Sequence, residues 1–196
     1  MNAINRFHIA RQQYSLQDIK RYYDYSLRAI ECTYSASANN RYGEIFFGRA
    51  ETEIRQEAAA VKRELSHLCS LCAMAYIESL FRIDSFVRVK HKCKGDLTST
   101  VRALLKAKSS IPLVRFEDLL DVWKNEYASE AELFRNIKNS FKFRHWIAHG
   151  RYWQPHDDID RHFDFPNIFI LAQQVEAALG HELRTQSAVG EPMRRL

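Results

Sequence analysis

The chain has 196 residues, of which 46% are apolar and 27% are charged, and its formal net charge is +5. This composition is that of a folded globular protein and excludes a disordered or collagen-like chain. Only six glycines and four prolines are present, which favours long helices over many short strands. The basic excess is compatible with an anionic partner such as a nucleic acid, and equally with a basic protein that has none.

Neither the N-terminal residues nor any later segment predicts a signal peptide or a membrane span, because no uninterrupted apolar run approaches about 18 residues. Cys69 and Cys72 form a C-x-x-C pattern, but it lies in an apolar helical segment and no second pair follows at zinc-site spacing. We therefore interpret the cysteines as buried free thiols. We expect a cytoplasmic protein that has no membrane segment.

Helical patterns begin at Ser15. Ser15 and Asp18 have capping-box spacing, and they predict a helix through residue 36. Residues 37–44 break this pattern. Apolar residues at helical spacing then predict a long helix from about Ala50 to about Lys90, which ends in a basic segment with a glycine.

The second half of the chain predicts further helices over residues 97–108 and 116–128, separated by a turn. Ser129 and Glu132 form another capping-box pattern, which predicts that a helix opens there and runs over residues 130–149.

Gly150 stands where a helix C-terminal glycine belongs, and residues 151–165 are predicted to be a loop. Pro166 is well placed for the first turn of a last helix. No repeat or linker divides the sequence. Residues 1–196 thus predict one all-α domain, a helical bundle.

Arg144 occupies an unusual place in the helix predicted over residues 130–149. At 100° per residue it falls within an apolar stripe, where a guanidinium is costly unless it is paired or borders a cleft. His145 and His149 lie at the edge of this stripe, four residues apart and therefore neighbours. The apolar members of the stripe are Leu133, Phe134, Ile137, Phe141 and Ala148.

Glu78 occupies a matching position in the long helix, within a second stripe formed with Leu71, Met74, Phe81 and Ser85. A helix with two apolar stripes must cover both, either inside the bundle or against a second subunit. We hypothesise that Glu78 and Arg144 face each other in or beside a cleft. The alternative is that they form a purely structural ion pair.

The segment "FRHWIAHG", residues 143–150, resembles the signature of HEPN domains, in which an arginine is followed after four to six residues by a histidine at a helix end. Arg144 and His149 match this spacing, and His145 matches the polar residue that often follows the arginine. "AMAYIESLF", residues 73–81, is similar to a second-helix segment of that family.

The resemblance covers about residues 60–185 and implies a HEPN-like antiparallel helical bundle with additional helices. Arg151 and His156 repeat the same spacing. However, they follow the helix-ending glycine and span a proline, so they lack the helical context of the first pair.

HEPN domains with this motif are mostly metal-independent endoribonucleases, and many are toxins of toxin–antitoxin or phage-defence systems. The resemblance implies RNA as substrate, no cofactor and no metal. In that chemistry the 2′-hydroxyl attacks the phosphate. His149 would act as general acid or base and Arg144 would neutralise the phosphate. His145 would orient His149 or bind phosphate.

The resemblance also implies a homodimer with two motifs in one cleft, and an antitoxin protein as a further partner. We expect Arg151, Tyr152 and Glu78 to contribute substrate contacts, with Trp153 beside them, although the two aromatic residues and Arg151 fit a packing role equally well. Tyr152 lies three residues after His149, whereas family members whose tyrosine is modified by their antitoxin have it two residues after.

Two other functions fit the residues. His145 and His149 have metal-ligand spacing, and acidic and histidine residues follow at 156–162, so a metal-dependent nuclease is one alternative. The other is a non-catalytic HEPN-like nucleotide- or partner-binding module that uses the basic clusters at residues 90–96 and 102–108. Chelator sensitivity distinguishes the first alternative, and binding without cleavage distinguishes the second.

Overall fold

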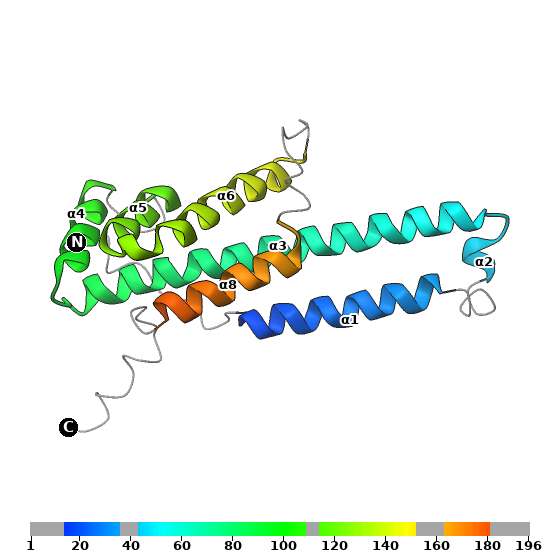
Figure 1. Cartoon of the computed structure of the whole chain (residues 1–196), viewed down its shortest axis with the longest axis horizontal. Coiled ribbons are helices and arrows are strands. Elements are labelled where there is room, and N and C mark those ends of the chain that lie inside the picture. The colour runs from blue at the N-terminus through cyan, green and yellow to red at the C-terminus, as the bar shows by residue number, and fades with distance from the viewer. Residues whose placement is uncertain (1–13, 36–42, 109–113, 152–162, 181–196) are drawn as a thin grey trace, which may run out of the picture.

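The structure is a computed structural model that describes residues 14–35, 43–108, 114–151 and 163–180. Within these ranges all regular structure is helical and no strand occurs. Figure 1 shows helices of very different length packed along one long axis. The predicted all-α class is therefore confirmed. The turn at 109–112 and most of the loop predicted over 151–165 lie outside the described residues.

Helix α1 spans Leu16–Tyr34 and begins as predicted. The Ser15 hydroxyl accepts a hydrogen bond from the Asp18 backbone N–H at 3.1 Å, and the Asp18 carboxylate accepts one from the Ser15 N–H at 3.3 Å. This reciprocal box satisfies two backbone donors of the first turn. A short helix, α2, spans Gly43–Phe46 in a segment that the sequence predicted only as a break.

Helix α3 spans Glu51–Lys90, within one residue of the predicted bounds. Its first turn is stabilised by Glu53, whose carboxylate accepts a hydrogen bond from the Ala50 N–H at 3.1 Å. Helix α4 follows over Asp96–Lys108 and α5 over Phe116–Glu126.

Helix α6 spans Ala131–Ala148 and is preceded by a 3-10 turn, η4, over Ala128–Glu130. The capping box predicted for Ser129 and Glu132 is wrong. Ser129 lies inside the 3-10 turn and Glu130 is the N-cap, without a side-chain cap bond. Because of this tight turn the N-cap is Glu130, one residue later than predicted, and the Ser129 side chain does not reach the backbone N–H groups that it would cap.

The end of α6 follows the prediction for Gly150. Gly150 has φ +80°, its N–H donates to the Ile147 carbonyl at 3.1 Å, and the Arg151 N–H donates to the Trp146 carbonyl at 3.1 Å. These two bonds form a Schellman motif, which needs the left-handed conformation that glycine adopts without strain.

Helix α8 spans Phe165–Leu179, with Asp164 as N-cap and Pro166 in the first turn. The Asp164 carboxylate accepts a hydrogen bond from the Asn167 N–H at 3.1 Å. The proline-initiated last helix is therefore confirmed, and its cap is an aspartate two residues before the proline.

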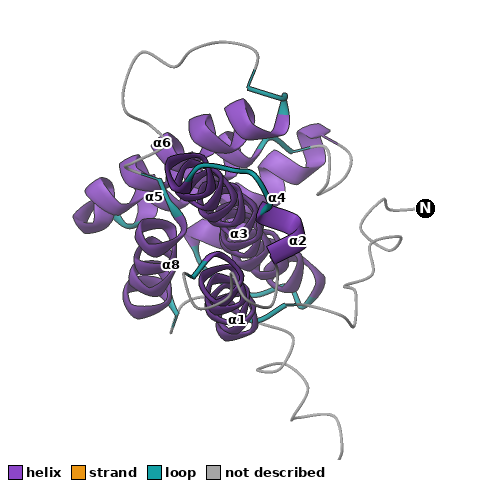
Figure 2. Cartoon of the chain, turned by 90° about the vertical axis from the view of Figure 1, so that its right-hand side faces the viewer, coloured by secondary structure: helices purple, strands orange, loops and turns teal. Residues whose placement is uncertain are grey.

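Helix α3 is the axis on which the other helices pack, and Figure 2 shows it between α1, α8 and α6. Contacts give the directions of the neighbours. Tyr34 reaches Glu57 and Glu31 reaches Lys62, so α1 is antiparallel to α3. Helix α6 is also antiparallel to α3, because Phe134 contacts Phe81 and Phe143 contacts His67.

Helix α8 runs parallel to α3. Near the start of α8, the Phe165 N–H donates to the Ser66 hydroxyl at 2.9 Å, and further along Tyr76 donates to Glu176 at 2.5 Å. Burial, followed by the hydrogen bond to the Glu176 carboxylate, raises the pKa of Tyr76. Because residue numbers rise together on both helices, the chain must return along α6 before it enters α8.

The second apolar stripe of α3 is covered within the chain. Phe81 is fully buried, with ring centroids 5.4 Å from Trp123 of α5, 5.8 Å from Phe116 of α5 and 6.3 Å from Phe134 of α6. Met74 and Ser85 are also fully buried. This stripe therefore needs no second subunit, which removes that reason for expecting a dimer.

All four cysteines are free, and only Cys69 is buried. Burial, with a smaller contribution from Cys72, raises the pKa of the Cys69 thiol to about 11, so it stays a neutral thiol at ordinary pH. Cys72 is exposed, so the prediction of a buried thiol is wrong for this member of the C-x-x-C pair.

A buried ion pair within α3 was not predicted. Arg88 donates to Asp84 at 2.7 Å, and their side chains are 6% and 0% exposed. The Arg88 guanidinium also lies over the Trp123 ring, 5.3 Å from its centroid. The i, i+4 spacing brings the charges together, and the aromatic face compensates part of their desolvation.

Truncation of Phe81 tests the importance of the contacts that its ring makes with α5 and α6. Phe81→Ala should lower the free energy of unfolding by about 3–5 kcal/mol, because it removes a fully buried ring and leaves a cavity. Urea unfolding followed by circular dichroism measures this. Ile45→Ala is the control, since Ile45 is 59% exposed on α2, and its effect should stay within about 0.5 kcal/mol. Equal losses for the two variants would contradict this packing.

Candidate active site

Arg144 lies on the side of α6 that faces α3. Its Nη1 is 3.2 Å from the Glu78 Oε2, and its side chain is 40% exposed while that of Glu78 is 16% exposed. The guanidinium also lies 5.3 Å from the centroid of the Phe141 ring. The prediction that Glu78 and Arg144 face each other is confirmed. One part of the guanidinium is anchored and another part is open to solvent.

The apolar stripe of α6 differs from the predicted one near the helix end. Ala148 is exposed, whereas Phe143 and Ile147 are buried. The buried face turns toward α8 and the first half of α3 there, so Arg144 stands at its edge rather than in its middle. An edge position explains how the charge is tolerated.

Glu78 binds a second guanidinium. Arg82, one turn further along α3, donates through Nε to the Glu78 Oε1 at 2.7 Å, and its Nη1 donates to the Val114 carbonyl at 3.2 Å. One carboxylate thus lies between two guanidiniums, and the cluster of Glu78, Arg82 and Arg144 keeps one positive charge in excess. An anion that approaches the open side of Arg144 is therefore still attracted.

His145 and His149 lie together at the C-terminal end of α6. Both residues are exposed, and their ring centroids are 4.1 Å apart with an interplanar angle of 54°. His149 is the C-cap residue and its N–H donates to the His145 carbonyl at 3.1 Å. The predicted neighbourhood of the two rings is confirmed. Two solvent-accessible imidazoles thus lie at the helix end, one and five residues after Arg144 in the sequence.

The end of α6 is held on α3 by Arg151. Its guanidinium binds both oxygens of Glu64 in a forked pair, at 2.5 and 2.6 Å, and lies 5.9 Å from the centroid of the Trp146 ring. Hydrogen bonding to Arg151 lowers the pKa of the Glu64 carboxyl below its ordinary value. Because Arg151 is already paired, its predicted substrate contact stays a prediction that requires this ion pair to open.

Below the surface, His67 supports the same helix end. His67 is 2% exposed, and its ring makes edge contacts with Phe143 at 5.5 Å and with Trp146 at 6.2 Å between centroids. These rings fill the space between α3 and α6 beneath the exposed histidines. The frame that carries His145 and His149 is thus packed on its inner side.

The remaining predicted site residues lie outside the described ranges. These are Tyr152, Trp153 and the acidic and histidine residues at 156–162, including the second arginine–histidine pair's His156. Among residues 14–35, 43–108, 114–151 and 163–180, no group of three or more histidine, cysteine or carboxylate side chains is arranged to hold a metal ion.

Sequence reasoning missed Arg82 and Glu64, although both leave a signal. Arg82 follows Glu78 by four residues, the spacing of a helical ion pair. Glu64 precedes Glu78 by four helical turns, about 21 Å along α3, and so returns to nearly the same face. Two carboxylates on one face of α3 match two arginines, Arg144 near the end of the antiparallel α6 and Arg151 three residues beyond that end.

No family model, curated protein or solved structure matches this chain.

Among the described helices, none has both the length and the apolar content that crossing a bilayer requires.

The pair of Glu64 and Arg151 makes a small, pH-dependent contribution to stability. Because the folded-state pKa of Glu64 lies below the ordinary 4.5, the contribution is complete above pH 4.5 and is lost as the pH falls through the lowered value. At neutral pH, Glu64→Gln should cost less than about 1 kcal/mol, since both side chains are partly exposed. The difference from wild type should be smaller at an acidic pH, below 4.5, than at neutral pH.

Urea unfolding at the two pH values measures this. Glu51→Gln is the matched control, because Glu51 pairs with Arg55 on the same helix but both side chains are about three-quarters exposed. The control should change stability less at neutral pH. A Glu64→Gln effect that grows on acidification would contradict the assigned ion pair.

Proposed function

We propose that this protein is a metal-independent endoribonuclease of the HEPN type, which acts in the cytoplasm as a toxin or phage-defence enzyme. The observation that carries the proposal is the end of α6. Two exposed imidazoles lie 4.1 Å apart, and Arg144, which precedes His145 by one residue and His149 by five, is anchored by Glu78. These are the groups that RNA cleavage through the 2′-hydroxyl requires.

The chemistry follows from the roles of these groups. RNA brings its own nucleophile, so the protein must take the 2′-hydroxyl proton, offset charge on the phosphate and protonate the leaving 5′-oxygen. His149 exchanges the proton, and Arg144 donates hydrogen bonds to the phosphate oxygens. His145 orients His149 or binds the phosphate. The products are a 2′,3′-cyclic phosphate and a 5′-hydroxyl end.

Glu78 acts on Arg144 rather than on RNA. Its carboxylate limits the rotation of the guanidinium, which lowers the entropy cost of binding a phosphate in one orientation. Arg82 shares this carboxylate, so Glu78 does not cancel the charge of Arg144 completely. We therefore assign Glu78 as a positioning residue, which refines the substrate contact expected from the sequence.

Cleavage in a chelator tests the function. Purified protein should cleave single-stranded RNA in EDTA, and His149→Ala should lower the rate about 10²–10⁴-fold with unchanged circular dichroism. Arg144→Lys should also lower it, because lysine keeps the charge but loses the forked donors. His91→Ala is a matched control, since His91 is the exposed C-cap of α3, and it should leave the rate unchanged.

A 2′-deoxy substitution at the cleaved nucleotide should block the reaction, because the nucleophile is then missing. Activity that disappears in EDTA would instead indicate the metal-dependent alternative. If a broad RNA panel, including total tRNA, stays intact with the wild type, the endoribonuclease proposal fails.

A non-catalytic binding module is the second candidate function. It is favoured by the pairing of both arginines at the end of α6, since Arg144 and Arg151 each bind a carboxylate in this structure. RNA or nucleotide binding without cleavage, unchanged by His149→Ala, would select this function. An antitoxin protein remains a proposed partner, and its recognition of Tyr152 lies outside the described residues.

A homodimer is part of the proposal because the two histidines of one chain can approach a bound phosphate from one side only. In an in-line displacement the attacking and leaving oxygens lie on opposite sides of the phosphorus. Rings 4.1 Å apart leave no room for a phosphate between them. A second copy that faces this site, so that the two copies form one groove, supplies the group on the other side of the phosphate.

The face of α3 beside the site fits such a contact. Leu68 is 57% exposed, and Cys72 and Ala75 are exposed one and two turns further along. This apolar strip lies between Glu64 and Glu78, the two residues that hold α6. Contact through the strip would bring two copies of the site close together.

Sedimentation equilibrium should therefore give twice the 23.0 kDa mass of one chain. Leu68→Lys should shift the protein toward monomer and lower its RNA cleavage in parallel, because a lysine placed in an apolar contact costs free energy. Ile45→Lys is the control, since Ile45 is 59% exposed on α2, away from the strip. A monomeric wild type with full activity would contradict the shared groove.

A further inference from the structure

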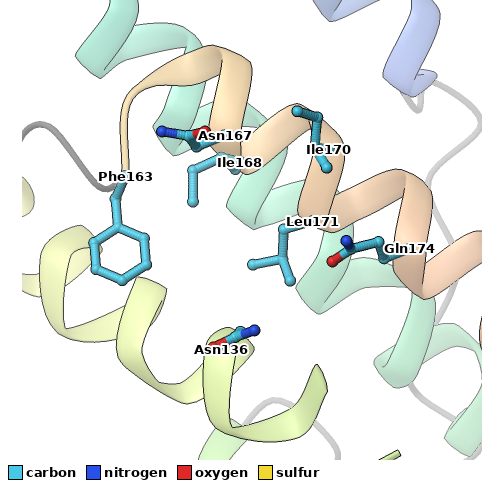
Figure 3. A pocket seen from close by; sticks show the side chains of 7 residues that line it. All are labelled: Asn136, Phe163, Asn167, Ile168, Ile170, Leu171 and Gln174. Atoms are coloured by element: carbon cyan, nitrogen blue, oxygen red, sulfur yellow. The ribbon is translucent and has the colours of Figure 1, made fainter. Parts of the chain in front are cut away.

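A cavity of about 360 Å³ that is open to solvent lies between α6 and α8, and its three carboxamide residues are exposed at its rim. Figure 3 shows side chains from both helices converging on it, with Asn136 from α6 on one side and Gln174 from α8 on the other. Its volume is in the lower part of the range of small-ligand sites, roughly 300–1,000 Å³. The lining residues are Asn136, Phe163, Asn167, Ile168, Ile170, Leu171 and Gln174.

The lining combines amide groups with apolar surface. Three of its side chains are carboxamides, and four are aliphatic or aromatic. The floor is firm, because Ile168 is 0% and Leu171 is 6% exposed. None of the lining side chains is charged, so the cavity offers no counter-ion to a phosphate, a carboxylate or an ammonium group. A ligand that fits this chemistry is neutral and carries both hydrogen-bond donors and acceptors.

The wall formed by the start of α8 is held in place before any ligand arrives. Ser70 donates to the Phe163 carbonyl at 3.2 Å, and Ser66 accepts from the Phe165 N–H at 2.9 Å. The Phe163 ring also packs on Phe143 of α6, with centroids 5.9 Å apart and an interplanar angle of 31°. Such preorganisation lowers the entropy cost of binding.

We propose that this cavity binds a nucleobase-type ligand, a planar neutral heterocycle with a hydrogen-bonding edge. The aliphatic floor and the Phe163 ring cover its flat faces, and the carboxamides of Asn136 and Gln174 meet its edge. A side-chain amide donates and accepts side by side, which matches adenine best among the bases. The base is presented either by a free nucleoside or by an RNA strand.

This site is separate from the proposed nuclease centre. Asn136 and His145 are nine residues apart on α6, about 180° around the helix, so they point to opposite sides, and Arg144 lies about two turns, roughly 12 Å, further along the helix than Asn136. Ligand binding at Asn136 needs neither His145 nor His149. The inference therefore goes beyond the proposed function and holds even if the protein cleaves no RNA.

Isothermal titration calorimetry with adenosine, guanosine, uridine and cytidine tests the site. Adenosine should bind wild type in a saturable manner and most tightly of the four. Gln174→Ala and Asn136→Ala should each weaken it at least about tenfold, because a truncated amide leaves an edge of the base unpaired. Gln173→Ala is the matched control, as Gln173 is exposed on the same helix and does not line the cavity.

A short oligoadenylate, titrated into the His149→Ala variant so that it is not cleaved, distinguishes the two sources of the base. If an RNA strand supplies the base, the oligomer binds more tightly than adenosine and Gln174→Ala weakens it. If a free nucleoside is the ligand, Gln174→Ala weakens the binding of adenosine but not that of the oligomer. The inference is overturned if none of these ligands binds saturably at millimolar concentration, or if binding is indifferent to both substitutions.

Discussion

The burial of α3 from Leu65 onward is the constraint on which the rest of the structure depends. In its first fourteen residues only Ile54 is buried, whereas from Leu65 onward buried side chains point in several directions. A helix that is apolar on more than one side must be enclosed by several partners. Helices α1, α8 and α6 enclose its middle, and α4 and α5 close its end. At about 1.5–3 kcal/mol for each large apolar side chain, this enclosure also fixes α6, and with it Arg144 and the histidines.

The two carboxylates of α3 that bind arginines near the end of α6 differ in the number of guanidiniums that they bind. Glu64 is matched by a single guanidinium in a forked pair, so its site is neutral and serves as an attachment. Glu78 lies between two guanidiniums, so its site remains positive and partly open. Because Glu64 binds one guanidinium and Glu78 binds two, the Glu64 contact is structural, whereas the Glu78 contact still attracts anions.

Most helix positions could be predicted from the sequence because they depend on local chemistry. The cap at Ser15, the bounds of α3 and the end of α6 at Gly150 each involve residues within one or two turns. The capping box at Ser129 could not be predicted correctly, because two local turns compete there. Ser129 has the right spacing for a cap, but it lies inside the 3-10 turn η4, so Glu130 is the N-cap and α6 begins at Ala131.

The candidate site, like the helices, could be predicted from the sequence where it depends on local patterns. Glu78 and Arg144 could be found because a charge on an apolar stripe needs a partner, and the histidines because they are four residues apart. The pairing of Glu64 with Arg151 joins residues 87 positions apart, so no local pattern contains it. The cavity between α6 and α8 also escaped notice, since amides on the two helices are ordinary surface residues until the fold brings them together.

The buried pair of Asp84 and Arg88 has a consequence for how α3 is oriented about its own axis. Asp84 has no exposed surface, and Arg88 rests on Trp123, so turning the helix by one residue would strand both charges against hydrocarbon. An α-helix is stiff to torsion, and this angular setting is carried about 30 Å along α3 to Glu64. The buried charge pair thereby sets the direction of Glu78, about 9 Å away, and of Glu64, about 30 Å away, the two carboxylates that pair with Arg144 and Arg151.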